Sequence, residues 1–225
     1  EPLARQLGDP TLLTKVLVTR ATQAGAHGDW AAAERSAREG ELTARSANLP
    51  SDVAGALGIV GTARREQGDL AGARAAHEQE AAIAAELGDP RAIGTASANL
   101  GNVAVAEQRF DLALEHYATA EATLRQSGDT AMLLPVLANR AQIHQYHQRF
   151  AEALADFAEA AVIAERAGNV AAAGQWGQVA IQLAYQLGDV ARAETVWGVL
   201  ATVARATGNQ SELQRAIGER ALMMI

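Results

Sequence analysis

The sequence predicts an all-α fold, a solenoid of antiparallel helical hairpins, and two observations carry this prediction. Glycines recur at a fixed spacing of 40 residues, at Gly88, Gly128, Gly168 and Gly208. The segments between them are rich in alanine, have helical periodicity and contain few runs of β-branched residues. A repeated unit of this length is typical of solenoids, in which each hairpin packs mainly on its neighbours.

Each repeat contains two turns, and the sequence marks both of them. The turn that ends a repeat carries Gly or Asn, mostly followed by Asp or Asn, and it recurs at Gly8, Asn48, Gly88, Gly128, Gly168 and Gly208. The turn inside a repeat has its marker at Gly28, Gly68, Gln108, Gln148 and Gly188. A Gly or Asn at a helix end supplies the left-handed residue that ends the helix, and the Asp or Asn after it can cap the next one.

These markers define where we expect the helices. The first helices of the five repeats are expected near 11–26, 51–66, 91–106, 131–146 and 171–186. The second helices are expected near 30–47, 70–87, 110–127, 150–167 and 190–207. They form a single solenoid domain over 1–225, with complete repeats 11–50, 51–90, 91–130, 131–170 and 171–210 and partial repeats 1–10 and 211–225. Because the partial repeats continue the same frame, we expect the chain to be a section of a longer solenoid or a domain of a larger protein.

The composition excludes several classes of function. The formal net charge of −7 and the pI near 5.3 argue against a nucleic-acid partner, which requires a basic surface. No apolar run approaches the roughly 20 residues that span a bilayer, so no membrane partner is expected. The chain has no cysteine, which excludes disulfides and thiolate metal sites and agrees with the reducing cytoplasm where we expect it. Lys15 is the single lysine among many arginines, which together with abundant alanine and glycine indicates a GC-rich bacterial genome.

Residues 98–120, ANLGNVAVAEQRFDLALEHYATA, resemble the tetratricopeptide-repeat consensus. The matching residues are the Leu-Gly pair of the first helix and the small–aromatic–small pattern of the second: Leu100, Gly101, Ala113, Tyr117 and Ala120. The fourth repeat is similar through Ala141, Phe150, Ala153, Phe157 and Ala160, whereas the remaining repeats have Ala37, His77 and Trp197 at the aromatic position. The long period, against about 34 in the common repeat, is similar to that of kinesin light chains, spindle-orientation adaptors and bacterial multidomain regulators. The resemblance implies a right-handed superhelix that binds proteins.

The first helices have an outward stripe on which we expect a partner to bind. In the third repeat, Ala96, Leu100 and Ala104 share the stripe that faces the second helix, and Asn99 and Asn102 lie roughly opposite. In tetratricopeptide superhelices this opposite stripe lines a concave groove. The residues that fall on it in the first two repeats are Lys15, Thr19, Thr22, Thr62, Arg65 and Glu66. The residues that we expect to contact a peptide are Arg65, Asn99, Asn102, Asn139, Gln142, Gln145, Tyr146, Gln175, Gln178, Gln182 and Tyr185.

Side-chain amides dominate the second half of this stripe. An amide both donates and accepts hydrogen bonds, so it can pair with the backbone of an extended peptide of any sequence. The resemblance implies that asparagines at the positions of Asn99, Asn102 and Asn139 clamp a target in this way. The alternative is that the stripe is a solvated helix face and that its asparagines belong to the repeat consensus. The stripe has few positive charges, which disfavours a clamp for a terminal carboxylate.

No motif in the sequence predicts catalysis, and we expect no enzyme, no cofactor and no metal site. His144 and His147 could share a metal with His116 or Glu115, but the spacing places no third ligand, so we interpret His144 as a hydrogen-bonded core histidine. Three arginines near the helix interfaces are expected to reach outward or to pair with carboxylates: Arg20, Arg64 and Arg140.

The leading functional hypothesis is a scaffold that binds another protein or an extended peptide, including a segment of the same protein. On this hypothesis the chain is the recognition or regulatory segment of a larger bacterial signalling protein. The alternative is an oligomerisation or autoinhibitory module of a multidomain NTPase or transcriptional regulator, with self-association through exposed solenoid ends. A third hypothesis places the chemistry in a neighbouring domain for which this segment is the sensor.

Overall fold

A computed structural model describes residues 2–209 of the chain. Every element in this range is a helix, and residues 2–209 contain no strand, which confirms the predicted all-α fold of helical hairpins. The chain divides into two compact units, Glu1–Gly128 and Asp129–Ile225, named unit 1 and unit 2. The partial repeat predicted over 211–225 lies outside the described residues, and the prediction of one continuous domain stays a prediction.

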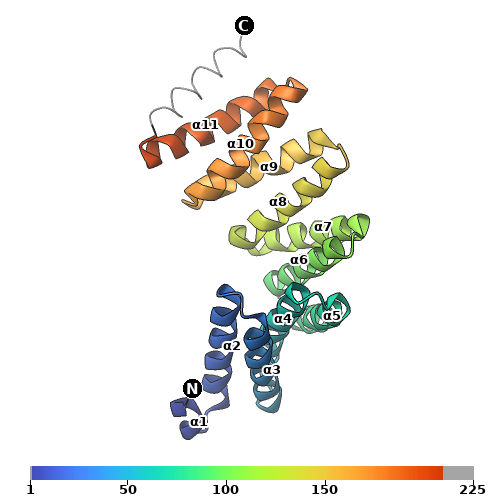
Figure 1. Cartoon of the computed structure of the whole chain (residues 1–225), viewed down its shortest axis with the longest axis vertical. Coiled ribbons are helices and arrows are strands. Elements are labelled where there is room, and N and C mark those ends of the chain that lie inside the picture. The colour runs from blue at the N-terminus through green and yellow to red at the C-terminus, as the bar shows by residue number, and fades with distance from the viewer. Residues whose placement is uncertain (1, 210–225) are drawn as a thin grey trace. The chain divides into compact units, whose positions relative to one another are not determined.

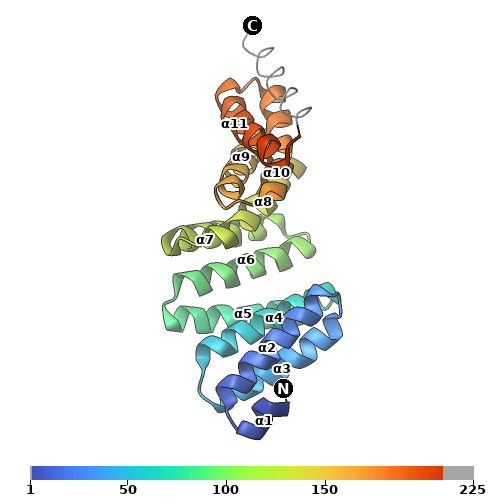
Figure 2. The ribbon, with the colours of Figure 1, turned by 90° about the vertical axis from the view of Figure 1, so that its left-hand side faces the viewer.

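The helices of each unit follow the 40-residue frame (Figure 1). Unit 1 contains α1 (Pro2–Leu7), α2 (Pro10–Ala26), α3 (Trp30–Ser46), α4 (Pro50–Glu66), α5 (Leu70–Leu87), α6 (Pro90–Ala106) and α7 (Phe110–Ser127). Unit 2 contains α8 (Thr130–Tyr146), α9 (Phe150–Arg166), α10 (Val170–Leu187) and α11 (Val190–Thr207). Each of these from α2 to α11 begins and ends within one residue of its predicted bounds. In Figures 1 and 2 the two helices of each hairpin lie side by side, as α6 and α7 do in unit 1.

The turns have the backbone conformation that their residues favour. All of the predicted end-of-repeat positions have a left-handed backbone with positive φ: Gly8, Asn48, Gly88, Gly128, Gly168 and Gly208. At the turn inside the repeat, Gln108 and Gln148 occupy the glycine position and also have positive φ, of 59° and 58°. The position in the frame, rather than the residue type, therefore sets the conformation of this turn.

The predicted helix caps are present. Oδ1 of Asp9 accepts hydrogen bonds from the backbone N–H groups of Thr11 and Leu12, at 2.9 and 3.1 Å. The residue after the turn marker caps six further helices, α6, α8 and α10 at the end-of-repeat turn and α3, α5 and α11 at the turn inside a repeat: Asp89, Asp129, Asn169, Asp29, Asp69 and Asp189. Each cap satisfies one or two of the N–H groups that a helix start leaves without a partner.

Close packing inside a hairpin depends on a small residue of the first helix that faces a large one of the second. Gly101 lies against the ring of Tyr117, and a Cβ atom at position 101 would stand 2.6 Å from Cε1 of Tyr117. Gly61 faces His77 in the same way, with 2.4 Å to Nε2. The side chains of Tyr117 and His77 are both 1% exposed. A glycine inside a helix costs up to about 1 kcal/mol relative to alanine, so the two glycines are explained by this close approach.

Unit 2 keeps this arrangement at Gly177, which faces Leu200, and adds aromatic contacts between hairpins. Phe157 of α9 stacks on Trp176 of α10, with ring centroids 5.4 Å apart. Phe157 and Trp197 are buried in the core of unit 2 together with Leu154 and Ile181. The aromatic position of the repeat thus fills the space to the next hairpin, as the sequence predicts.

Carboxylates neutralise two of the arginines near the helix interfaces, as expected. Nε of Arg64 donates to Glu34 at 2.7 Å, and Arg140 donates two hydrogen bonds to Asp156, at 2.8 and 2.6 Å. The interpretation of His144 is partly wrong. Its ring is mostly buried, but Nδ1 has no hydrogen-bond partner among the described residues, and Nε2 lies 3.8 Å from Asp156. Arg140 occupies the carboxylate that His144 would otherwise bind.

Candidate functional site

The outward stripe of α2, α4 and α6 borders an open cavity of about 520 Å³ in unit 1. Residues of these three first helices form most of it: Ala21, Thr22, Gly25, Ala26, Gly55, Gly58, Ile59, Thr62, Thr95 and Asn99. The second helices add Trp30 at the start of α3 and Glu80 of α5. The volume is within the range of ligand-binding pockets, about 300–1,000 Å³.

Missing side chains create the hollow. Gly55 and Gly58 of α4 lie three residues apart and so on the same side of the helix. A Cβ atom at position 55 would meet no atom within 4 Å, which shows that this part of the wall is open. On α2, Gly25 likewise has no side chain, and the indole of Trp30 packs against it. A Cβ atom at position 25 would stand 3.0 Å from this ring. The cavity is therefore a consequence of glycine on these helices: Gly55 is exposed and meets no neighbour, whereas Gly25 and Gly58 are half-buried and lie close to Trp30 and Glu80.

A buried carboxylate lies in the wall of this cavity. Glu80 is 6% exposed, and its Oε2 accepts hydrogen bonds from Nδ1 of His77 at 2.7 Å and from Nδ2 of Asn99 at 3.2 Å. Its Oε1 lies 3.4 Å from the same amide nitrogen of Asn99. Gly58 makes room for the carboxylate, since a Cβ atom at position 58 would be 2.8 Å from Oε1.

The predicted contact residues of unit 1 are in three different environments. Asn99 lines the cavity and donates to Glu80, while Thr22 and Thr62 of the same stripe also line it. Asn102 is half-buried, and its Oδ1 accepts a hydrogen bond of 2.7 Å from the hydroxyl of Tyr117. Arg65 forms an ion pair of 2.6 Å with Glu66 and does not line the cavity. Of the three predicted residues in this unit, the structure therefore brings Asn99 alone to the cavity.

The predicted residues of unit 2 lie on α8 and α10 and are largely exposed. Asn139 is half-buried, and the remaining ones are exposed: Gln142, Gln145, Tyr146, Gln175, Gln178, Gln182 and Tyr185. Tyr146 is 71% exposed, and Tyr185 contacts the ring of Trp197 edge-on at 5.7 Å.

The repeat register relates this group to the cavity of unit 1. Gln142 and Gln182 follow Thr62 by two and three repeats, and Gln175 follows Thr95 by two. The amides of α8 and α10 thus occupy the frame positions that line the cavity on α4 and α6. We call this common stripe the first-helix face; it comprises Thr22, Gly58, Thr62 and Asn99 in unit 1 and Gln142, Gln175, Gln182 and Tyr185 in unit 2.

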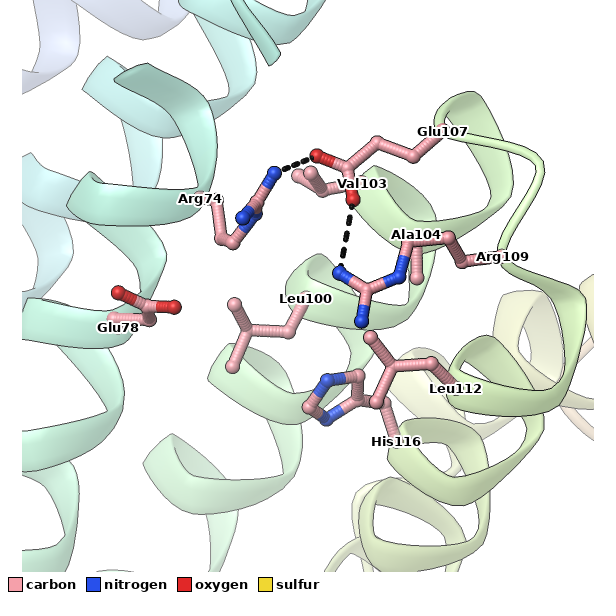
Figure 3. A pocket seen from close by; sticks show the side chains of 9 residues that line it. All are labelled: Arg74, Glu78, Leu100, Val103, Ala104, Glu107, Arg109, Leu112 and His116. Atoms are coloured by element: carbon pink, nitrogen blue, oxygen red, sulfur yellow. Dashed lines mark hydrogen bonds and ion pairs between the residues drawn. The ribbon is translucent and has the colours of Figure 1, made fainter. Parts of the chain in front are cut away.

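A second cavity in unit 1, of about 280 Å³, lies between α5, α6 and α7 (Figure 3). Its main feature is Glu107, which pairs with Arg74 of α5 and, at 3.5 Å, with Arg109 before α7. His116 faces the same space, and burial, assisted by Arg109, lowers its pKa despite the nearby glutamates. The charges are balanced within the cavity, so this cluster ties three helices together and offers no net charge to a ligand.

Sequence reasoning missed the cavity and the role of Glu80. Gly55, Gly58 and Gly61 recur every third residue in the predicted helix 51–66, and such spacing places all three on one side. Glycine inside a helix is unfavourable, so this pattern could have indicated a place of close approach. Glu80 also occupies the repeat position at which the third and fourth repeats have the small residues Ala120 and Ala160. This difference could have marked Glu80 as unusual.

The described residues include no group of three or more His, Cys, Asp and Glu side chains that could hold a metal ion. His116 is in unit 1, and His144 and His147 are in unit 2. None of the helices described in 2–209 combines the length and apolar character needed to cross a membrane.

Comparison with solved structures identifies the fold. No family model matches the chain, and no curated protein matches it by sequence. The crystal structure of a Podosopora anserina putative kinesin light chain with nearly identical TPR-like repeats has a TM-score of 0.64 and 15% identity, covering 89% of this chain and 98% of that one. The fold is that of tetratricopeptide-repeat proteins.

Two further structures with this fold come from prokaryotic proteins. BtubC of P. vanneervenii is 19% identical, with a TM-score of 0.65 and coverage of 99% of this chain and 86% of BtubC. A signal transduction ATPase of Pyrococcus horikoshii that has a tetratricopeptide-repeat sensor is 13% identical, with a TM-score of 0.61. The match covers 95% of this chain but 36% of the ATPase.

Proposed function

We propose that the chain binds an extended segment of polypeptide along its first-helix face and catalyses no reaction itself. The observation that carries this proposal is the cavity on that face of unit 1, together with exposed amides at the same frame positions in unit 2. An extended peptide has unpaired N–H and C=O groups along its length, and Gln142, Gln175 and Gln182 can donate to and accept from them. In unit 1 the cavity can take a side chain of such a segment, and in unit 2 the amides can pair with the backbone of one.

The wider role that we propose is a recognition or regulatory segment of a larger bacterial signalling protein. The likeness to the ATPase of Pyrococcus horikoshii supports it, because that protein has a tetratricopeptide-repeat sensor as one part of a longer chain. A partner segment from the same protein would suit such a role, since a tethered segment binds at a high effective concentration.

A selection from random peptides tests the proposal. The chain is immobilised and used to enrich a displayed library of random short peptides, and the affinity of a selected peptide is then measured by fluorescence anisotropy. Replacing Gln142, Gln175 and Gln182 by alanine removes three exposed amides without disturbing the core. Because each net hydrogen bond contributes about 1 kcal/mol, we expect the triple variant to bind at least about tenfold more weakly.

The matched control is a double variant, Gln79→Ala with Gln126→Ala, which removes exposed amides from the second helices α5 and α7. It should bind the selected peptide as the unchanged chain does. Failure to enrich any peptide would contradict the proposed function, and so would equal losses of affinity in the triple variant and the control.

A further inference from the structure

We infer that the cavity of unit 1 selects a cationic side chain, arginine or lysine, of the bound peptide, and that Glu80 is its counter-charge. This inference rests on the proposed function and adds the chemistry of the partner. Among the described residues that line the cavity, Glu80 is the only one with an ionisable side chain. The other lining side chains are apolar, or neutral and polar, so any charge selection in this cavity depends on that carboxylate.

The burial of Glu80 makes it effective as a counter-charge. A carboxylate that is 6% exposed has little water around it, and a charge of opposite sign is attracted more strongly there than at a wet surface. Removing a carboxylate from water is costly unless other groups compensate. His77 and Asn99 compensate in part, through donated hydrogen bonds of 2.7 and 3.2 Å. The bond from His77 to the carboxylate needs one proton on Nδ1, which a neutral imidazole supplies.

Glu80 also retains capacity for another donor. An ionised carboxylate has about four lone-pair sites, and His77 and Asn99 use the shorter contacts at Oε2. At Oε1 the contact with Asn99 is 3.4 Å, which is long for an N–H···O bond. Oε1 lies next to Gly58, whose missing side chain leaves that approach open on the first-helix face. An ammonium or guanidinium group entering from this face would meet Oε1.

The walls of the cavity suit the rest of such a side chain. Lysine and arginine have apolar stems that pack along apolar surface while the charged group binds elsewhere. Ile59 and Ala26 supply that surface, and Trp30 supplies an aromatic ring on which a cation can also stack. The formal charge of the chain, −7, adds a long-range field that attracts a basic peptide.

Packing alone does not explain a glutamate at this position. The equivalent residues of the other repeats are Gly40, Ala120, Ala160 and Leu200, and none of them is charged. Unit 1 accommodates the longer, charged side chain by having glycine at both 58 and 61, which face Glu80 and His77. Gly58, His77 and Glu80 each differ from the residues at the same frame positions of the other repeats, and they meet at one carboxylate in a cavity wall, which is the arrangement expected of a binding group.

The experiment uses the same peptide library with three proteins: the unchanged chain, Glu80→Gln and Glu78→Gln. Glu78 is the matched control because it lies on the same helix, α5, and lines the other cavity. We expect peptides selected by the unchanged chain and by Glu78→Gln to share a basic position, and those selected by Glu80→Gln to lack it. A selected peptide and its twin with glutamine in place of the basic residue are then measured against all three proteins.

Glu80→Gln should weaken the basic peptide at least about tenfold and leave the affinity of the glutamine twin nearly unchanged. Equal weakening of both peptides would overturn the inference, because it would show a structural role for Glu80. If Glu80→Gln does not fold, Gly58→Ala provides the second test, since its methyl group would stand 2.8 Å from Oε1 and obstruct the approach. It should weaken the basic peptide more than the glutamine twin, and equal effects would again overturn the inference.

The two proposals fail in different ways. Suppose that the selected peptides lack a basic position but bind more weakly to the variant in which Gln142, Gln175 and Gln182 are replaced by alanine. This result would overturn the inference about the cationic side chain and leave the proposed function standing. If no protein enriches any peptide, both proposals are wrong.

Discussion

Gln108 and Gln148 adopt a backbone conformation that suits glycine. Both have φ near +60°, whereas the equivalent turns of unit 1 at positions 28 and 68 contain glycine. In a left-handed conformation the Cβ atom of a non-glycine residue lies too close to the following carbonyl oxygen, which costs about 1–2 kcal/mol. The backbone N–H of Gln148 still donates to Gln145 O at 3.0 Å, so the turn keeps its hydrogen bond despite that cost.

We therefore expect Gln108→Gly and Gln148→Gly each to stabilise the protein by about 0.5–1 kcal/mol. This net gain is the free energy released by relief of the backbone strain, reduced by the entropy cost of ordering a more flexible glycine. The measurement is the midpoint of urea unfolding, followed by circular dichroism at 222 nm, a wavelength that reports roughly on helix content. The matched control is Gln126→Gly in α7, an exposed position with ordinary helical geometry. Gln126→Gly should lower the urea midpoint, because this position has no backbone strain to relieve. If Gln108→Gly and Gln148→Gly also lower the midpoint, the strain argument is wrong.

Glu34 connects α3 to the end of α4 and gives the stability a dependence on pH. Burial raises the pKa of its carboxyl, but hydrogen bonds from Arg64 and Gln67, at 2.7 and 3.1 Å, outweigh burial and hold the pKa below its ordinary value of 4.5. A carboxyl whose pKa is lower in the folded state stabilises the fold above its unfolded pKa. That contribution is lost as the pH falls through the folded pKa.

Glu34→Gln should accordingly lower the free energy of unfolding by about 1–2 kcal/mol at pH 7, the usual size for a hydrogen bond to a charged group. In acid below the folded pKa, the variant and the unchanged protein should be equally stable. Urea midpoints measured across this pH range test the expectation, with the exposed Glu86→Gln as the control. A difference in midpoint that stays constant over the range would show that ionisation of Glu34 is not involved.

Helices and their ends were predictable because the forces that set them are local. A left-handed glycine, an Asp cap and alanine-rich helical periodicity all act within a few residues, so α2 to α11 were predicted to within one residue. The contacts that define the candidate site join residues from different helices, such as Glu80 of α5 with Asn99 of α6. Periodicity predicts which stripe of a helix faces outward, but it does not predict which side chain reaches across from a neighbour. For this reason periodicity placed Asn99 on the stripe that borders the cavity, but it did not predict the hydrogen bond of Asn99 to Glu80.

The same limit explains why Asn102 differs from Asn99. Both asparagines were assigned to one stripe of the helix 91–106, three residues apart. In the structure Tyr117 of α7 donates its hydroxyl hydrogen to Asn102 at 2.7 Å, so this amide is partly committed to its own hairpin. The hydroxyl group of a tyrosine at the aromatic position can reach the outward stripe. Phe157 and Trp197, which occupy this position in unit 2, have no hydroxyl group and cannot form the same hydrogen bond. The exposed glutamines of α8 and α10 are consequently better candidates for contacts with a partner than Asn102.

Repeat proteins gain stability from each hairpin and from its contacts with the next one, so a compact group of hairpins can fold by itself. Unit 1 has its own buried clusters, one around Val60 and another around Leu57. All residues that line the larger cavity also belong to this unit. We therefore expect a chain limited to residues 1–128 to be helical and to unfold cooperatively.

Trp30 allows this expectation to be tested at the cavity itself, because it is the single tryptophan of residues 1–128 and its ring packs against Gly25. Its emission should be that of a partly buried indole and should change to that of an exposed one at the same temperature at which the helical signal is lost.

The control is the full chain with Trp176 and Trp197 replaced by phenylalanine, in which Trp30 again reports alone. A fragment whose Trp30 emission resembles that of the unfolded chain at low temperature would show that unit 1 depends on residues beyond 128. Coincident transitions would show that the cavity and its carboxylate are properties of unit 1, and the peptide selections could then be repeated on that unit.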